Sequence, residues 1–192
     1  MPTQVTLPLA RFLARLPAVL LGAAAVFVAL SAAPPSALRA AEINDARQAM
    51  NDKNFPRAVE ILDAFLAERP SDHRALALRG EAHLDVYSPD APTKALADLN
   101  RAIEIQPAKN GHDLVSRGRA YIALRDFDKA LADLNKAIEL APDDAERYYY
   151  RGNLHSDKQD LKAAFIDFHK AIELNPDYAL AYVARGCIQW RR

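Results

Sequence analysis

The stretch ALADLNKAIELAP, Ala130–Pro142, has two close copies elsewhere in the chain. These are ALADLNRAIEIQP at Ala95–Pro107 and AFIDFHKAIELNP at Ala164–Pro176, and a weaker version, AVEILDAFLAERP, lies at Ala58–Pro70. The prolines that end the four segments follow one another at intervals of 34 to 37 residues, and a set of glycines keeps intervals of 34 to 38. A period near 34 with a single insertion predicts an array of repeated supersecondary units.

Within one copy, the apolar residues are spaced as one face of a helix requires. Ala130, Leu134 and Ala137 follow at i, i+4 and i+7, which places them in a single stripe. Further apolar residues widen this stripe beyond what one partner helix covers, so each helix pair must stack on its neighbours. Gly118, in the preceding helical segment, lets two helices approach closely, and Pro142 ends the second helix.

This pattern resembles the tetratricopeptide repeat, a helix–turn–helix unit of 34 residues. With each unit numbered from 1, the family has a large residue at 4, a small one at 8 and an aromatic at 11. Its second helix has a small residue at 20, a large apolar residue at 24, alanine at 27 and proline at 32. The unit at residues 111–144 matches at every one of these positions, with Leu114, Gly118, Tyr121, Ala130, Leu134, Ala137 and Pro142.

The resemblance covers residues 42–192 and implies an all-α, right-handed superhelical solenoid. The expected units are a degenerate one at about 39–72, three further ones at 73–110, 111–144 and 145–178, and a partial one at 179–192. The unit at 73–110 carries extra residues around Ser88–Thr93, which account for the single insertion.

The first 41 residues have a different character, because they contain no acidic side chain. Arg11 and Arg15 precede an uncharged, largely apolar run at Leu16–Leu38, and small residues follow. This order predicts a secretory signal peptide that is cleaved near residue 32 or residue 41. An uncleaved inner-membrane anchor, an organellar transit peptide and a misassigned start are the alternatives. We therefore expect an exported protein of the bacterial periplasm, with an inner-membrane anchored protein as the alternative.

The charge balance narrows the classes of partner. Lys plus Arg and Asp plus Glu each number 25, so the formal net charge is zero. Residues 1–41 hold three of the arginines, which leaves 22 basic against 25 acidic residues beyond them. A mildly acidic domain is not steered toward nucleic acid, so no nucleic-acid partner is expected. The single cysteine excludes an intramolecular disulfide framework and a cysteine-rich zinc site.

Charged residues recur three apart along the second helix of each unit. The sets are Asp98, Arg101 and Glu104; Asp133, Lys136 and Glu139; and Asp167, Lys170 and Glu173. Catalytic or metal-binding acids are one interpretation. Recurrence at the structural period favours the other, a solvated helix face with i, i+3 ion pairs.

The histidines and the cysteine show no recognisable catalytic or metal-binding spacing. His83 and His155 occupy the aromatic position 11 of their units, where we expect them to pack. Cys187 is also expected as a small packing residue, with a redox handle or an intermolecular bridge as alternatives. An enzyme would need a constellation formed across units, such as His83 with His155. The sequence therefore predicts a non-enzyme with no cofactor, no metal site and no small-molecule substrate.

In this family, the first helix of each unit lines a concave groove, and positions 2, 5, 9 and 12 share one helical face. The resemblance thus implies a peptide-binding groove lined by Arg47, Arg74, Ala77, Glu81, His112, Val115, Arg119, Ile122, Tyr149 and Asn153. Apolar residues flanked by charges of both signs suit an extended or helical peptide. We expect Tyr148 in the core and Tyr149 in the groove as an anchor. No lysine occupies position 5, so the resemblance does not extend to members that clamp a C-terminal carboxylate.

The partial unit supplies a first helix from Ala179 to about Trp190 without a second helix after it. Ile188 and Trp190 would then leave apolar surface at this end, so we expect either that the end pairs with another chain or that the chain is truncated relative to its relatives. Two functional classes follow: an exported scaffold or assembly factor that binds a protein or peptide, and a structural module that forms homo-oligomers through this helix.

Overall fold

A computed structural model of the chain describes residues 35–107 and 111–190, with side chains from 41 to 107 and from 111 to 189. The chain divides into two units, Met1–Ala41 and Glu42–Arg192. The predicted signal peptide or anchor lies outside the described residues except for residues 35–41, which begin a helix. The packing discussed below belongs to the second unit.

The described residues are helical, with no strand among them. The helices are α2 (Pro35–Asn51), α3 (Phe55–Glu68), α4 (His73–Asp85), α5 (Ala91–Ile105), α6 (His112–Ala123), α7 (Phe127–Leu140), α8 (Ala145–Asp157), α9 (Leu161–Leu174) and α10 (Ala179–Trp190). Within the described ranges, no helix combines the length and the apolar character that crossing a membrane requires.

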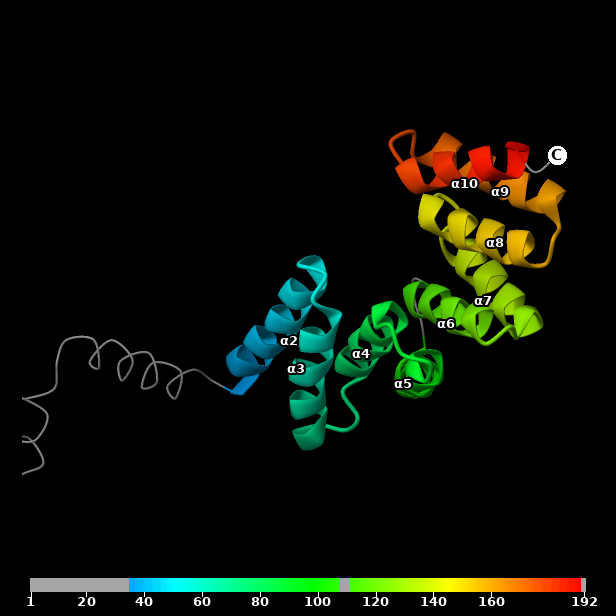
Figure 1. Ribbon diagram of the computed structural model, residues 1–192. Helices are drawn as coiled ribbons and strands as arrows, with labels where there is room; N and C mark the ends of the chain where they lie inside the picture. The colour runs from blue at the N-terminus through cyan, green and yellow to red at the C-terminus, as the bar shows by residue number, and fades with distance from the viewer. Residues whose placement is uncertain (1–34, 108–110, 191–192) are drawn as a thin grey trace, which may run out of the picture. The chain divides into compact units, whose positions relative to one another are not determined.

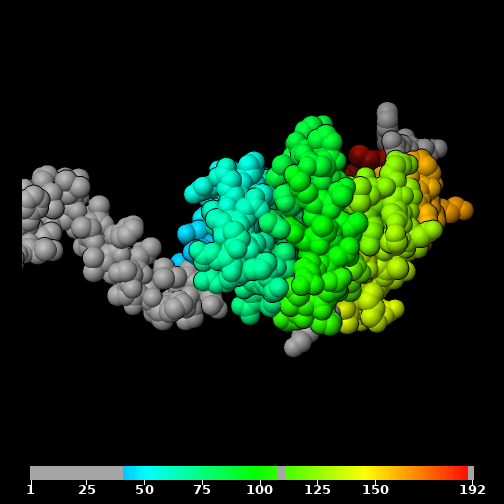
Figure 2. Space-filling model, turned by 90° about the horizontal axis from the view of Figure 1, so that it is seen from below, coloured from blue at the N-terminus to red at the C-terminus, as the bar shows by residue number. Residues whose placement is uncertain are grey.

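The helices pack in consecutive pairs, α4 with α5, α6 with α7 and α8 with α9. The first helices of successive pairs also contact one another, α4 with α6, α6 with α8 and α8 with α10 (Figure 1). In the space-filling view, the bands from cyan through green to yellow lie side by side in chain order (Figure 2). The prediction of an all-α solenoid of stacked helix pairs is therefore confirmed.

The core follows the predicted stripe of small and large residues. Ala130, Leu134 and Ala137 are fully buried, and the equivalent residues of the neighbouring pairs are at most 1% exposed. Gly118 makes room for this stripe, because a Cβ atom built there would lie 3.0 Å from Cγ of Leu134. The small residue at position 8 is thus a packing requirement rather than a source of flexibility.

Polar side chains begin most of the helices. Five residues that precede helices accept a hydrogen bond from a backbone N–H of the first turn: Asn54, Asp72, Asp126, Asp144 and Asp160. These caps satisfy donors that the helix itself leaves without partners. Helix α6 begins instead after Gly111, whose φ of 78° lies in the left-handed region that glycine tolerates best.

The expectation of a solvated charged face is wrong for the first acidic residue of each set of charged residues spaced three apart. Asp98, Asp133 and Asp167 are only 7%, 8% and 3% exposed. Each of these carboxylates accepts two hydrogen bonds from an arginine of the preceding helix. For example, Nε and Nη2 of Arg117 donate to the two carboxylate oxygens of Asp133, at 2.7 and 2.8 Å. The second and third residues of these sets do form the expected exposed i, i+3 ion pairs, such as Lys136 with Glu139 at 2.9 Å.

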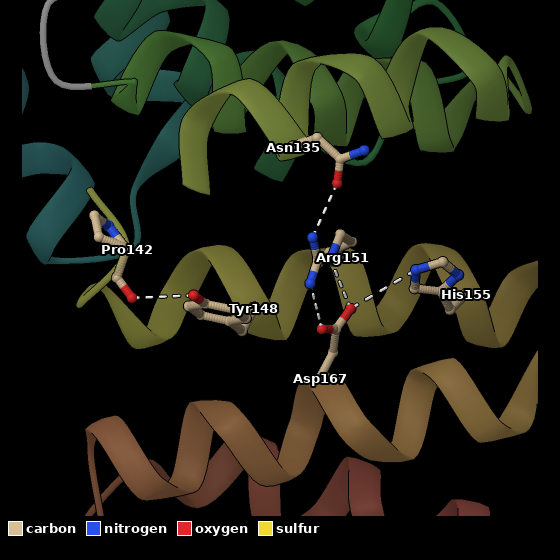
Figure 3. A network of polar contacts seen from close by, with 6 residues as sticks. All are labelled: Asn135, Pro142, Tyr148, Arg151, His155 and Asp167. Atoms are coloured by element: carbon tan, nitrogen blue, oxygen red, sulfur yellow. Dashed lines mark hydrogen bonds and ion pairs between the residues drawn. The ribbon is translucent and has the colours of Figure 1, made fainter. Parts of the chain in front are cut away.

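The same arginines also join successive pairs. Arg151 donates to both carboxylate oxygens of Asp167 in α9 and, through Nη1, to Oδ1 of Asn135 in α7 at 2.9 Å (Figure 3). Arg79 and Arg117 make the equivalent bonds back to α3 and α5. Each guanidinium therefore ties three helices together, and the hydrogen bonds to aspartate raise the pKa of all three arginines.

Candidate functional site

Half of the predicted groove residues line one pocket. A pocket of about 420 Å³ lies between α2, α4 and the start of α6. Its wall includes Arg47, Arg74, Ala77, Glu81 and His112 from the predicted set, together with His73, Leu78, Gln106, Pro107 and Asp113. Because these residues come from three different units, only the stacking of first helices brings them together.

An ion pair crosses this pocket from one unit to the next. Nδ1 of His112 at the start of α6 lies 3.0 Å from Oε1 of Glu81 in α4, and the Ser116 hydroxyl lies 3.3 Å from the same oxygen. The hydrogen bond to Glu81 raises the pKa of His112 to about 9, so the imidazole is charged at neutral pH. Burial and the nearby charge of Glu81 raise the pKa of Asp113.

These side chains also include potential metal ligands. Among the described residues, Glu81, His112 and Asp113 each offer one donor atom, and the three atoms lie within 4.8 Å of one another. The expectation of no metal site rested on the spacing of histidine and cysteine along the chain. That spacing carries no sign of this cluster, because Glu81 belongs to a different unit and two of the three ligands are carboxylates.

Three other predicted groove residues serve the packing between units. Val115 is buried and Ile122 half-buried in a core cluster of α6 and α7 that also includes Leu154 of α8, in the next unit. The Arg119 side chain is 24% exposed, pairs with Asp85 of α4 at 3.0 Å and lies 5.0 Å from the ring centroid of Tyr150 in α8. Arg119 therefore connects the first helices of three units.

The tyrosine run at the start of α8 differs from its predicted arrangement. Tyr148 is half-buried rather than fully in the core, and its hydroxyl lies 3.1 Å from the backbone oxygen of Pro142 (Figure 3). The ring centroid of Tyr149 lies 6.0 Å from that of Phe168 and 5.2 Å from that of Tyr178. Tyr149 is thus half-buried between the ring of Phe168 in α9 and the ring of Tyr178, the residue that precedes α10. Asn153, the remaining predicted residue, is half-buried one turn later.

The two position-11 histidines are half-buried, as expected for packing residues. Nε2 of His155 lies 3.8 Å from the Asp167 carboxylate, beside the arginine network (Figure 3). Burial lowers the pKa of His83. The expectation of a packing role is wrong for Cys187, which is exposed. The reason is that no described element covers that face of α10.

Helix α10 exposes several large apolar side chains. Leu180, Tyr182 and Val183 are 56%, 44% and 65% exposed, whereas Ala181 and Ile188 are buried against α9 and its neighbours. A Cβ atom at Gly186 would meet nothing within 4 Å, in contrast to the equivalent glycines of α4, α6 and α8. The predicted exposure of Ile188 is therefore wrong, and the prediction for Trp190 falls outside the described side chains. The exposed apolar residues lie elsewhere on the helix.

Comparisons with known protein families agree with the repeat assignment. A tetratricopeptide-repeat model matches residues 43–110, a TPR-repeat model matches residues 118–159, and a further tetratricopeptide-repeat model matches residues 145–178. No curated protein matches the chain.

Solved structures show the same fold at low sequence identity. MamA from Desulfovibrio magneticus RS-1 is 18% identical, with a TM-score of 0.63 over 80% of this chain and 84% of that one. A thermophilic TPR protein from Thermus thermophilus, TTC0263, is 22% identical, with a TM-score of 0.65 over 76% and 78%. The first TPR domain of Spaghetti (RPAP3), bound to an HSP90 peptide, is 23% identical, with a TM-score of 0.55 over 62% and 91%. The family models, the repeated core and the helix pairing together show that the chain is a tetratricopeptide-repeat protein.

Proposed function

We propose that the repeat domain binds a peptide or protein segment across the pocket between α2, α4 and α6. The observation that supports this most directly is the coincidence of the pocket with five residues expected to line a groove. One structural neighbour, the RPAP3 domain, is bound to an HSP90 peptide, which shows that this fold accommodates peptides in at least that protein.

The chemistry of the pocket limits the segment it would accept. Glu81 and His112 neutralise each other within the wall, while Arg47 and Arg74 have exposed side chains. The buried Ala77 supplies an apolar floor. A segment with an acidic side chain beside a small apolar one complements this surface, because the arginines offer charge-assisted hydrogen bonds and the floor offers a dry contact.

Charge reversal at the rim tests this proposal. Proteins retained by the immobilised chain from an extract of its own cells are compared with those retained by Arg74→Glu and by Arg57→Glu. Arg57 is a matched control, since it is an exposed arginine on α3 that lies outside the pocket and pairs with Glu60 of its own helix at 3.0 Å. We expect a partner that is lost with Arg74→Glu and kept with Arg57→Glu. Equal retention by both variants would contradict the proposal.

We further propose that the protein works outside the cytoplasm as a scaffold or assembly factor. The support is the order of charge, apolar run and small residues in positions 1–41. Cleavage near residue 32 would leave α2 intact, whereas cleavage near residue 41 would remove its first turns. Fractionation of a bacterial host with intact-mass analysis distinguishes the outcomes. A shortened periplasmic species supports export, a full-length membrane species indicates an anchor, and a full-length cytosolic species contradicts both.

Self-association through α10 is the second candidate function. The exposed Leu180 and Val183 are the observation that favours it, because residues three apart share a face of α10 and this face is apolar, with Tyr182 also exposed next to Val183. Light scattering over a range of concentrations tests this function. A mass that rises with concentration in the wild type and not in Val183→Glu supports it, and a monomer throughout rules it out.

A further inference from the structure

We propose that Glu81, His112 and Asp113 form a binding site for one Zn²⁺-type divalent ion. The three donor atoms come from two units and lie within 4.8 Å of one another at the wall of a pocket that is open to water. This inference goes beyond the proposed binding of a peptide and does not depend on it.

The separation between the Glu81 and His112 donor atoms suits a small ion with short bonds. Zinc binds histidine nitrogen and carboxylate oxygen at about 2.0–2.2 Å, so two donors on a tetrahedral ion lie roughly 3.4 Å apart. Oε1 of Glu81 and Nδ1 of His112 are 3.0 Å apart already. The His112 side chain is 53% exposed, so a small movement of its ring at the surface is enough to widen this separation.

The donor set selects the class of ion. One imidazole nitrogen with two carboxylate oxygens is the mixed set that zinc accepts, with water in the fourth position. Calcium and magnesium prefer an all-oxygen shell, and the imidazole nitrogen therefore disfavours them. The pocket of about 420 Å³ has ample space for the water ligand.

A bound ion replaces the ion pair between His112 and Glu81, because ligation uses, in its deprotonated form, the imidazole nitrogen that now faces the Glu81 carboxylate. Arg47 and Arg74 line the same pocket and oppose a divalent cation. The ion should therefore exchange readily and be removed by a chelator without unfolding the domain, unlike the ion of a closed structural zinc site.

Calorimetric titration of the chelator-treated full chain with ZnCl₂ tests the site. We expect one equivalent to bind, and an affinity at least about tenfold lower in Glu81→Gln and in His112→Gln, because loss of a ligand costs at least as much as loss of a supporting partner. The matched controls are His169→Gln and Glu173→Gln. These residues form a similar exposed pair on α9, 3.5 Å apart, and belong to no three-ligand group among the described residues. Both controls should bind as the wild type does.

A check of folding, a substitute variant and a competition with Ca²⁺ complete the test. Circular dichroism checks that each variant keeps its helicity, and Asp113→Asn replaces Glu81→Gln if the latter unfolds. Three results would each overturn the proposal. These are an unchanged zinc affinity in the ligand variants, no bound equivalent of zinc in the wild type, and displacement of zinc by equimolar Ca²⁺.

Discussion

The contact between Gly152 and Phe168 shows how much a single hydrogen atom matters in this array. A Cβ atom at Gly152 would lie 2.6 Å from the Phe168 ring, and that ring is only 1% exposed. The equivalent position in α10, Gly186, has open space instead. The same residue at the same place in the repeat therefore has two different energetic roles.

Replacing these two glycines by alanine should shift stability in opposite directions. We expect Gly152→Ala to destabilise the domain by about 1–2 kcal/mol, because overpacking outweighs the gain in helix propensity. Gly186→Ala should stabilise it by up to about 1 kcal/mol, since only the propensity changes. Urea unfolding measures both, and a shift in the same direction for the two variants would contradict the packing argument.

The Arg151–Asp167 pair should carry a large share of local stability. Arg151→Met leaves Asp167, which is 3% exposed, without its bidentate partner, and we expect a loss of about 3 kcal/mol. The double variant Arg151→Met with Asp167→Leu should recover more than half of this, because no buried charge is left behind. Lys170→Ala, which breaks an exposed pair, should cost at most about 0.5 kcal/mol. In urea unfolding, a double variant as unstable as the single one would show that the pair matters through shape rather than charge.

His83 should make the domain less stable in mild acid. Burial holds its pKa in the folded chain below the ordinary value of 6.5, so the unfolded chain binds more protons in that range. The contribution of neutral His83 to the free energy of unfolding is complete above pH 6.5 and is lost as the pH falls through the pKa of His83 in the folded chain. Urea midpoints between about pH 7.5 and 5.5 should fall more steeply in the wild type than in His83→Phe. Parallel curves would be incompatible with a depressed pKa at this residue.

At the scale of helices, the pairing was predictable because the signal repeats. Three near-identical segments place small and large residues at fixed positions, and each copy independently indicates the same stripe. The structure buries those stripes in α5, α7 and α9 as expected. Because each helix pair of an array packs on its neighbours in the same way, the core residues recur at the same positions of each repeat.

The arginine–aspartate bonds between helices were not predicted, although a sign of them exists. Arginine precedes the glycine of α4, α6, α8 and α10, as in Arg117–Gly118, and aspartate precedes the large residue of α5, α7 and α9, as in Asp133–Leu134. Both dipeptides recur at the period of the repeat. The spacing of residues within one helix does not show, however, whether the aspartate side chain points to solvent or to the arginine of the preceding helix. The pairing depends on how close α6 and α7 lie, and this is a property of the fold.

The candidate site was predictable only in part, for the same reason. Positions on one helical face could be assigned, and five of them do line the pocket. Arg119 and Tyr149 share that face, yet Arg119 packs against Tyr150 of the next unit and Tyr149 packs against Phe168 of its own unit. The sequence indicates the face of a helix but not how the side chains of adjacent units fill the space between them.

Helix α10 should stabilise its neighbours selectively. Ile188 is 2% exposed and packs in a cluster with Phe168 and Ala164 of α9. We expect Ile188→Ala to cost about 2–4 kcal/mol and to reduce hydrogen-exchange protection in α9 and α10 more than in α3 and α4, because each unit contacts mainly its neighbours. Equal loss of protection along the whole array would show instead that the units unfold as one.

At the scale of the molecule, the residues that hold the units together differ from those that line the pocket. Arginine–aspartate bonds and alternating small and large residues hold the units in register, whereas the pocket between α2, α4 and α6 has exposed arginines at its wall. The chain has no net charge, so long-range attraction contributes little and recognition depends on contacts within this pocket.

Photocrosslinking in living cells, with a photoreactive amino acid at one position per variant, tests whether a partner occupies this pocket. Position 74 lies in the pocket, and position 101 is an exposed site on α5 outside it. We predict a discrete crosslinked protein from position 74 that is absent from position 101 and is lost when Arg47→Glu is added. Crosslinks of equal strength from both positions, or from position 101 alone, would contradict binding through this pocket.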